Sequence, residues 1–384
     1  MGKLLYLRSG LVFAASALLG VTPADGFSPT ATRSQLLAEL QRCLTPTDLL
    51  DRVGARVSRS IDPDGSLASL VLVRLSKLVI SLDNQDRAFV ADESSTKTLN
   101  AIIESLLDSD PSSNCESIVE ATKACSTFSR ISPYSPNSTY ERLFNFWNDS
   151  SDIVSQLEPH HTSGVKWAFD VLTLQSSAPS PTALDQAYAD LNLPFAIIPG
   201  CLAGLESLSV DRLTSQVHFR VDDIRTTSNK VVSERRQTAW EGDTGVAPFT
   251  YSGKAMPRSD WSPLVVQVRD VVQARTNQYY NGCLLNLYTD GCSGMRYHID
   301  PDQGTLWDYD TAVVSVGASR RFAFRAMSSS TLQPHNFVVM HGDLTYMFGE
   351  CQSQFQHTVK KADDKTDTTP RASLVFKRTW ECKK

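Results

Sequence analysis

Two histidines and one aspartate in the C-terminal half of this 384-residue chain have the chemistry to bind a metal ion. His298-Ile299-Asp300 places an imidazole and a carboxylate two residues apart, and at the period of a β-strand two such side chains lie on one face. His357 follows 59 positions after His298. Two histidines and one carboxylate with the opposite positions open form the facial triad of non-haem Fe(II) oxygenases. We therefore expect His298, Asp300 and His357 to converge on one ion, with the imidazoles within roughly 6 Å because each bond is about 2 Å long.

An H-x-D triplet alone occurs by chance in many chains, so the neighbouring motifs decide its interpretation. These motifs are Asn286-Leu287-Tyr288, Ser315–Phe322, His341–Gly349, Gln354–His357 and Pro370-Arg371. In this order and spacing they resemble the AlkB family of 2-oxoglutarate- and iron-dependent dioxygenases, over roughly residues 193–380. The resemblance implies the cofactors Fe(2+), 2-oxoglutarate and O2, with His298, Asp300 and His357 as both the catalytic and the metal-binding residues.

The resemblance also assigns a binding site for 2-oxoglutarate. Arg371 occupies the position of the arginine that grips the distal carboxylate, for which a planar guanidinium is the best match. Asn286 and Tyr288 match further polar contacts to the same molecule. The family's second arginine is replaced by Lys377, with Arg378 beside it. Lysine keeps the charge but loses the two-pronged geometry, so either Lys377 or Arg378 is expected to complete this site.

Three residues are expected to contact the substrate. Arg236–Asp243 and Phe249–Gly253 resemble the lid that covers the nucleobase in the family's nucleic-acid demethylases. Within them, Trp240 and Tyr251 have aromatic faces that can stack on an extruded base, although both fit the core of a hairpin equally well. Asp302 matches the family's carboxylate that contacts the damaged base, provided that Pro301 does not end the strand first.

The function that follows is oxidative demethylation of N-alkylated nucleobases in DNA or RNA, in which 2-oxoglutarate yields succinate and CO2 and the hydroxylated alkyl group leaves as an aldehyde. Nucleic acid is the expected partner. One alternative is a demethylase or hydroxylase of protein side chains, because AlkB relatives also act on proteins. Another is a helical-repeat binding protein whose oxygenase domain is inert. The net charge of −5 excludes attraction of the whole molecule to a polyanion, so nucleic-acid binding needs a local basic patch.

The expected fold class is α+β, with a double-stranded β-helix (jelly roll) oxygenase domain preceded by an all-α helical domain. Short strand patterns separated by turns dominate after residue 284, whereas helical periodicity dominates residues 39–175. The helical domain fits either a divergent repeat or an irregular bundle, and an RNA or a protein is its expected partner. A Ser/Pro-rich stretch over residues 176–184 predicts the linker, and residues 185–384 form the dioxygenase domain.

The N-terminus has the pattern of a targeting sequence. Residues 1–26 combine Lys3 and Arg8 with a short apolar stretch and small residues at 24–26, as signal peptides do. Residues 27–38 then contain Ser, Thr and Arg and no acidic residue, as organellar transit peptides do. Together they predict a plastid location, with the secretory pathway as the alternative and no stable membrane span. Eight scattered cysteines without metal-ligand spacing are interpreted as free thiols.

Overall fold

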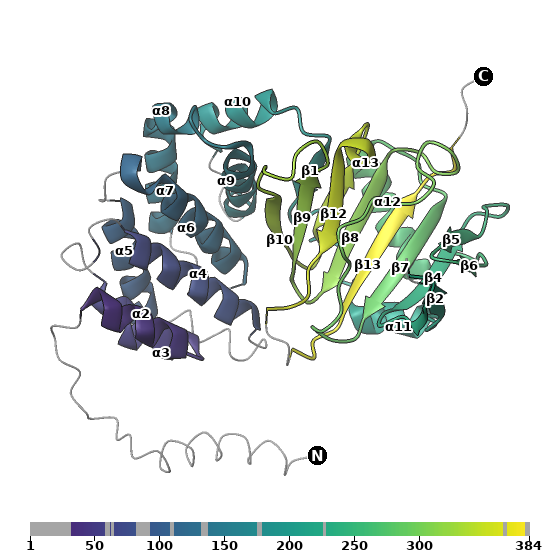
Figure 1. The fold of residues 1–384 in the computed structure, drawn as a ribbon, viewed down its shortest axis with the longest axis horizontal. Helices are drawn as coiled ribbons and strands as arrows, with labels where there is room; N and C mark the ends of the chain where they lie inside the picture. Colours follow the sequence, from purple (N-terminus) through teal and green to yellow (C-terminus); the bar gives the residue numbers. More distant parts are fainter. Residues whose placement is uncertain are drawn as a thin grey trace, which may run out of the picture.

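A helical body and a β-rich body lie side by side in the computed structural model (Figure 1). The structure describes residues 32–57, 62, 65–81, 93–107, 111–131, 137–174, 179–225, 228–363 and 367–380. The segment expected to be a signal peptide, residues 1–26, lies outside them, and so do residues 27–31 of the expected transit segment and residues 176–178 of the expected linker.

The helical body is built around one apolar core. Its elements are α2 (Arg33–Arg42), α3 (Pro46–Arg52), the 3-10 helix η1 (Gly54–Arg56), α4 (Ser66–Ser81), α5 (Glu93–Leu107), α6 (Pro111–Ile131), α7 (Asn137–Asp149), α8 (Ser151–Val154), α9 (Pro159–Leu172) and α10 (Thr182–Asp190). Leu72, Ile102, Val119 and Phe169 come from four of these helices and are buried in the same cluster. Apolar residues at helix spacing give each helix one face to bury, so the expectation of an all-α domain is confirmed.

Two segment boundaries differ from those expected from the sequence. Helix α10 begins inside the expected linker 176–184 and adds Leu184 to the helical core, which places the division between the bodies after Asp190. Helix α2 overlaps the expected transit segment 27–38: a capping box at Thr32 starts it, and Leu36 and Leu40 are buried. Cleavage at residue 38 would divide a packed helix, so a removable segment fits better before Thr32.

The β-rich body consists of a six-stranded sheet in the order β1-β11-β8-β13-β7-β4 and a three-stranded sheet in the order β10-β9-β12. The strands are β1 (Phe195–Ile198), β4 (Gln237–Gly242), β7 (Gly282–Tyr288), β8 (Thr311–Gly317), β9 (Arg320–Ala326), β10 (His335–Val339), β11 (Leu344–Met347), β12 (Phe355–Val359) and β13 (Arg371–Lys377). Two hairpins lie beside them, β2 (Asp223–Arg225) with β3 (Val231–Ser233) and β5 (Phe249–Tyr251) with β6 (Lys254–Met256). The antiparallel pairing throughout is that of a jelly roll, as expected.

Two helices, α11 (Val210–Gln216) and α12 (Pro263–Thr276), cover the outer face of the large sheet (Figure 1). Ser262 precedes α12 as its N-cap, but its side chain makes no capping bond. Instead, the Ser262 hydroxyl donates to the buried carboxylate of Glu241 on β4. The apolar face of α12, including Leu264, Val268 and Val272, packs on β7, β8 and β13.

The two bodies meet along α6, α9 and the small sheet. Trp167 of α9 packs edge-on against Phe337 of β10, with ring centroids 6.2 Å apart. The fully buried Asp343 carboxylate accepts the backbone N–H groups of Gly200 and Met340 at 2.8 and 2.7 Å, and it forms an ion pair with Arg130 of α6. One buried carboxylate therefore connects the helical body to two segments of the β-rich body.

No helix in the described part of the chain has both the length and the apolar character that crossing a membrane requires. Seven cysteines lie in that part, and no disulfide joins any two of them.

A buried histidine at this junction gives the fold a dependence on pH. His335 is 6% exposed, and its Nδ1 lies 2.7 Å from the Ser163 hydroxyl of α9. Burial, with a smaller effect of His160, lowers the pKa of His335 to about 4. Between the ordinary histidine pKa of about 6.5 and this value, the unfolded chain binds a proton that the folded chain does not, so the unfolding free energy falls as the pH falls.

We therefore predict that acidification from pH 7 to pH 4 removes roughly 3 kcal/mol of unfolding free energy through His335. In urea unfolding at a series of pH values, His335→Gln should remove this part of the pH dependence while keeping a partner for Ser163. His218→Gln changes an exposed histidine and is the control. Parallel pH profiles for the wild type and His335→Gln would contradict the prediction.

Candidate metal centre and co-substrate site

His298 and Asp300 lie in an extended segment that pairs with β12 through one bridge. The bridge joins His298 to His357 antiparallel, and each backbone N–H donates to the other's carbonyl, at 3.0 and 2.9 Å. The expected β-strand is thus reduced to a single residue pair, because the chain turns at Pro301 and Asp302 takes a left-handed conformation with φ 57°. Directly opposite residues in an antiparallel pair project to the same side, which brings the two imidazoles together.

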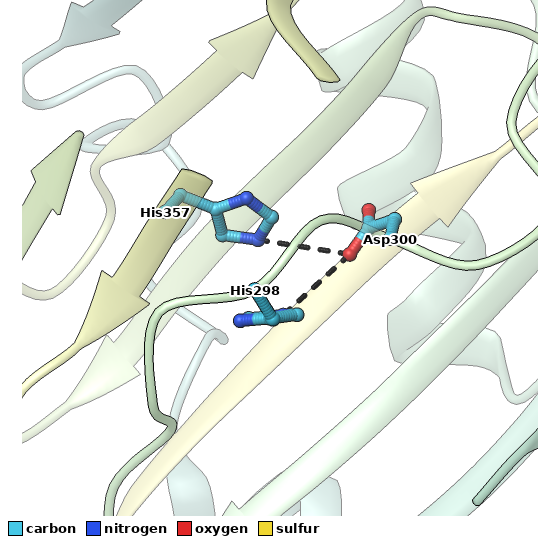
Figure 2. A group of neighbouring side chains, drawn as sticks. All are labelled: His298, Asp300 and His357. Atoms are coloured by element: carbon cyan, nitrogen blue, oxygen red, sulfur yellow. Dashed lines mark ion pairs between the residues drawn. The ribbon is translucent and has the colours of Figure 1, made fainter. Parts of the chain in front are cut away.

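The three expected ligands converge from these two segments. Asp300 Oδ1 lies 3.7 Å from His298 Nε2 and 3.6 Å from His357 Nε2, and the three donor atoms lie within 4.8 Å of one another. The imidazole centroids are 4.2 Å apart, inside the limit of roughly 6 Å that bonds of about 2 Å allow. Figure 2 shows both rings turned toward the carboxylate. Two nitrogens and one oxygen at these separations can occupy one face of a single ion.

Hydrogen bonding and burial prepare both histidines to be ligands. His298 Nδ1 lies 2.8 Å from the carbonyl of Arg296, an interaction that places the proton on Nδ1 and leaves the Nε2 lone pair facing Asp300. Burial, aided by the nearby His298, lowers the pKa of His357 to about 3. His357 is therefore neutral at physiological pH, as metal binding requires.

Asp300 remains ionised although it is largely enclosed. Burial alone would raise the pKa of its carboxyl group, but Lys377 and the two histidines together lower it well below the ordinary value. Lys377 Nζ donates to Asp300 Oδ2 at 2.8 Å. Because Oδ2 is engaged by the lysine, Oδ1 is the oxygen that faces both imidazoles.

Comparison with known proteins agrees with this geometry. Residues 196–377 match the model of the 2OG-Fe(II) oxygenase superfamily. An uncharacterized protein of Acanthamoeba polyphaga mimivirus is 29% identical over 153 residues, which are 40% of this chain and 78% of that protein. The DNA oxidative demethylase ALKBH2 of Homo sapiens is 31% identical over 155 residues, which are 39% of this chain and 58% of that protein. Residues 196–377 are thus similar to the 2OG-Fe(II) oxygenases of the AlkB type.

A third relative, the alpha-ketoglutarate-dependent dioxygenase alkB homolog 3 of Bos taurus, is 28% identical over 153 residues. This match covers 38% of the present chain and 52% of the relative. The chain thus spans little more than half the length of the two curated relatives that have an assigned activity.

The AlkB-like domain contains a buried guanidinium with unsatisfied donors. Arg371 is 0% exposed and donates from Nη2 to the Ser315 hydroxyl at 3.0 Å, but its Nε and Nη1 have no hydrogen-bond partner. Among the described residues, no carboxylate lies within ion-pair distance of it. Burial lowers its pKa to about 10, and Arg320 acts in the same direction. A carboxylate ligand would satisfy both donors and compensate the charge, so Arg371 fits the distal end of 2-oxoglutarate.

The other two expected co-substrate residues lie on the strand next to Arg371. Tyr288 is directly opposite Arg371 in the pairing of β7 with β13, and the guanidinium carbon lies 5.5 Å from its ring centroid. Asn286 is buried and donates to the Ser373 hydroxyl at 3.3 Å, whereas its Oδ1 has no partner. An unsatisfied buried oxygen is costly, and a ligand or water that donates to it would remove this cost.

The two basic residues at the end of β13 have different partners. Lys377 is 1% exposed and, besides Asp300, contacts the Thr311 hydroxyl at 3.3 Å. Arg378 forms an ion pair with Asp308 and donates to Gln278 at 3.1 Å. Arg378 is therefore bound to other residues, and Lys377 is paired with Asp300, a candidate metal ligand, rather than free for a co-substrate.

The three expected substrate residues lie in different surroundings. Trp240 is 1% exposed, donates to the Ala247 carbonyl and packs between Phe249 and Trp307, which is the arrangement of a hairpin core. Tyr251 is half-buried and donates to Glu234 at 2.8 Å. Asp302 is exposed, and the left-handed turn takes it off the His298-Asp300 strand face. The structure thus does not bring these three together with the metal ligands.

Gln352 is a positioning residue that the sequence did not indicate. It is 4% exposed on the short helix α13 (Cys351–Gln354), and its Oε1 accepts the backbone N–H of Asp300 at 3.0 Å. This bond fixes the backbone of Asp300, the carboxylate among the three candidate metal ligands. Its proximity to His357 was the only signal in the sequence, because a glutamine without a motif does not reveal its partner.

We predict that Lys377→Ala weakens metal binding by about 10-fold to 100-fold, the usual cost of losing a group that orients a ligand. Without Lys377, the buried Oδ2 of Asp300 loses its counter-charge and the carboxylate is free to rotate. Titration with Mn(II), followed by electron paramagnetic resonance, measures the affinity. Lys377→Arg should recover most of it, and Arg378→Ala, which removes a basic residue bound to Asp308, is the control. Unchanged Mn(II) affinity in Lys377→Ala would show that the lysine does not position Asp300.

Proposed function

We propose that this protein oxidatively demethylates N-alkylated nucleobases in nucleic acid, using Fe(II), 2-oxoglutarate and O2. The observation that carries the proposal is the combination of the His298, Asp300 and His357 cluster with a buried Arg371 that has no carboxylate partner. When bound, the iron and the co-substrate supply the oxidation of the alkyl group. The chain itself supplies the binding and orientation of both.

Different residues of the site would bind the metal and the co-substrate. His298, Asp300 and His357 would hold the metal, Gln352 and Lys377 fix the aspartate, and Arg371 with Asn286 and Tyr288 would hold 2-oxoglutarate. The pKa values of His357 and Asp300 lie below neutrality, so neither ligand needs to lose a proton when the metal binds. A free Arg371 argues against the inert-domain alternative, because the cation that grips the co-substrate is available.

A nucleic-acid substrate is supported by the relatives and by Asp302. The relative that is 31% identical is named a DNA oxidative demethylase. Asp302 is exposed two residues after the metal-binding Asp300, and its carboxylate can accept a hydrogen bond from an amino nitrogen and favour a base made cationic by methylation. A rearrangement of the turn at 301–304, in which the Asp302 carbonyl accepts backbone N–H groups of residues 305–307, would be needed to bring Asp302 over the metal.

The test compares two aspartates two residues apart. Asp300→Ala should abolish turnover and metal binding together. Asp302→Ala should keep Mn(II) and 2-oxoglutarate bound while lowering the demethylation of methylated oligonucleotides, measured by mass spectrometry of the nucleosides after incubation with Fe(II) and 2-oxoglutarate. Asp211→Ala, on the exposed side of α11, is the control. Unchanged demethylation by Asp302→Ala across several methylated bases would remove Asp302 from the site and favour the protein-side-chain alternative.

We further propose that the protein is directed to a plastid by the residues before Thr32. The proposal rests on the signal-like segment 1–26 and the following stretch, which lacks acidic residues. A fluorescent protein fused to residues 1–31 should accumulate in plastids, and residues 1–60 should give the same result. Retention of both fusions in the cytosol would contradict the proposal, and accumulation in the secretory pathway would support the alternative location.

A further inference from the structure

A cavity of about 640 Å³ lies where the helical body meets the oxygenase domain. Its walls come from α4, α6 and α9 on one side and from the starts of β9, β10 and the chain after β12 on the other. In Figure 1 the C-terminal end of α4 points toward the region of β10. Cavities of roughly 300–1,000 Å³ accommodate small molecules, so this one has room for a ligand the size of a nucleotide. It is distinct from the metal centre, because none of the three metal ligands lines it.

The lining carries a net positive charge in a protein whose total charge is negative. Seven basic and three acidic side chains contribute to it, a net of +4, whereas the whole chain has −5. Lys77 on α4 and Lys361 after β12 are both exposed, and neither has an ion-pair partner among the described residues. Burial and the nearby Arg321 lower the pKa of Lys360, with Asp363 only partly opposing them. Positive charges are thus crowded together, and a bound anion would relieve their repulsion.

The lining of the cavity also includes aromatic residues. Trp167 and Phe337, which are 2% and 4% exposed, both line it. The indole Nε1–H of Trp167 is buried and has no hydrogen-bond partner, which is unusual because buried donors are nearly always satisfied. Aromatic residues in the lining, next to basic side chains, suit a ligand that combines an aromatic ring system with a phosphate.

We propose that this cavity binds a nucleotide unit, with the phosphate on Lys77, Lys360 and Lys361 and the base against Trp167 and Phe337. The unit comes from a nucleic-acid strand or from a free nucleotide, since both present the same chemistry. Apolar contacts to a base and phosphate contacts do not depend on base sequence. The binding needs neither metal nor an alkylated base, so it stands independently of the demethylation proposed above. It gives the helical body a role as one wall of a second nucleotide site.

Charge reversal at the rim tests the proposal without touching the oxygenase site. The double variant Lys77→Glu with Lys361→Glu should weaken the binding of a short fluorescein-labelled single-stranded DNA, without alkylated bases, to the full-length protein. We expect a loss of roughly tenfold, and a slope of log affinity against log salt that falls by about 0.7, the value for one lost phosphate contact on a single strand. Fluorescence anisotropy in the absence of Fe(II) and 2-oxoglutarate measures both quantities.

The matched control is Lys97→Glu with Arg212→Glu, which makes the same charge change at exposed positions outside the cavity. Equal loss in both double variants, or no loss in the cavity variant, would overturn the proposal. A selective loss in the cavity variant would support it. Competition with adenosine 5′-monophosphate then identifies the source: displacement of the DNA assigns the site to a free nucleotide, and persistent DNA binding assigns it to the strand.

Discussion

The register of β13 between β7 and β8 is the constraint on which the oxygenase site depends. Arg371 lies opposite Tyr288 and Gly317, and Ser373 lies opposite Asn286 and Ser315. Alternate side chains of a strand face opposite sides, so the polar residues point inward while Ala372, Leu374 and Phe376 pack under α12. A slip of one residue would place these three apolar side chains in the site and bury the charged ones outside it. The apolar face thus fixes where the charged groups lie.

The buried charged residues of the oxygenase site are only partly paired with other residues of the chain. Asp300 has Lys377 as its partner, whereas Arg371 has none among the described residues. Burying an unpaired charge is expensive, and the folding of the two apolar faces has to offset that cost. A carboxylate that binds to Arg371 compensates its buried charge. The free energy gained by this pairing contributes to the affinity for the co-substrate.

Sequence patterns anticipated the elements of the oxygenase domain more accurately than the contacts of individual side chains. The strands around Arg371 follow from alternation, which is a local property of the chain. The convergence of His298 with His357, 59 positions apart, was expected from the resemblance of the surrounding motifs to a known family. The engagement of Lys377 by Asp300, 77 positions away, depends on which strands become neighbours. The same holds for Trp240, because edge-on packing against Trp307 and exposure to a substrate have the same sequence pattern. The left-handed turn at Asp302 depends on the residues 305–307 that bond to its carbonyl.

The helical body is part of the oxygenase structure rather than a separate attachment. Arg130 is the only charged partner of the buried Asp343 among the described residues, and burial raises the pKa of this carboxyl group while Arg130 opposes the rise. Without α6, two backbone N–H groups would remain to stabilise a carboxylate at the junction of β10 and β11. Without α9, Phe337 and His335 on the small sheet would lose Trp167 and Ser163. The sheet that carries His357 is therefore completed by the helices, and the metal centre depends on both bodies.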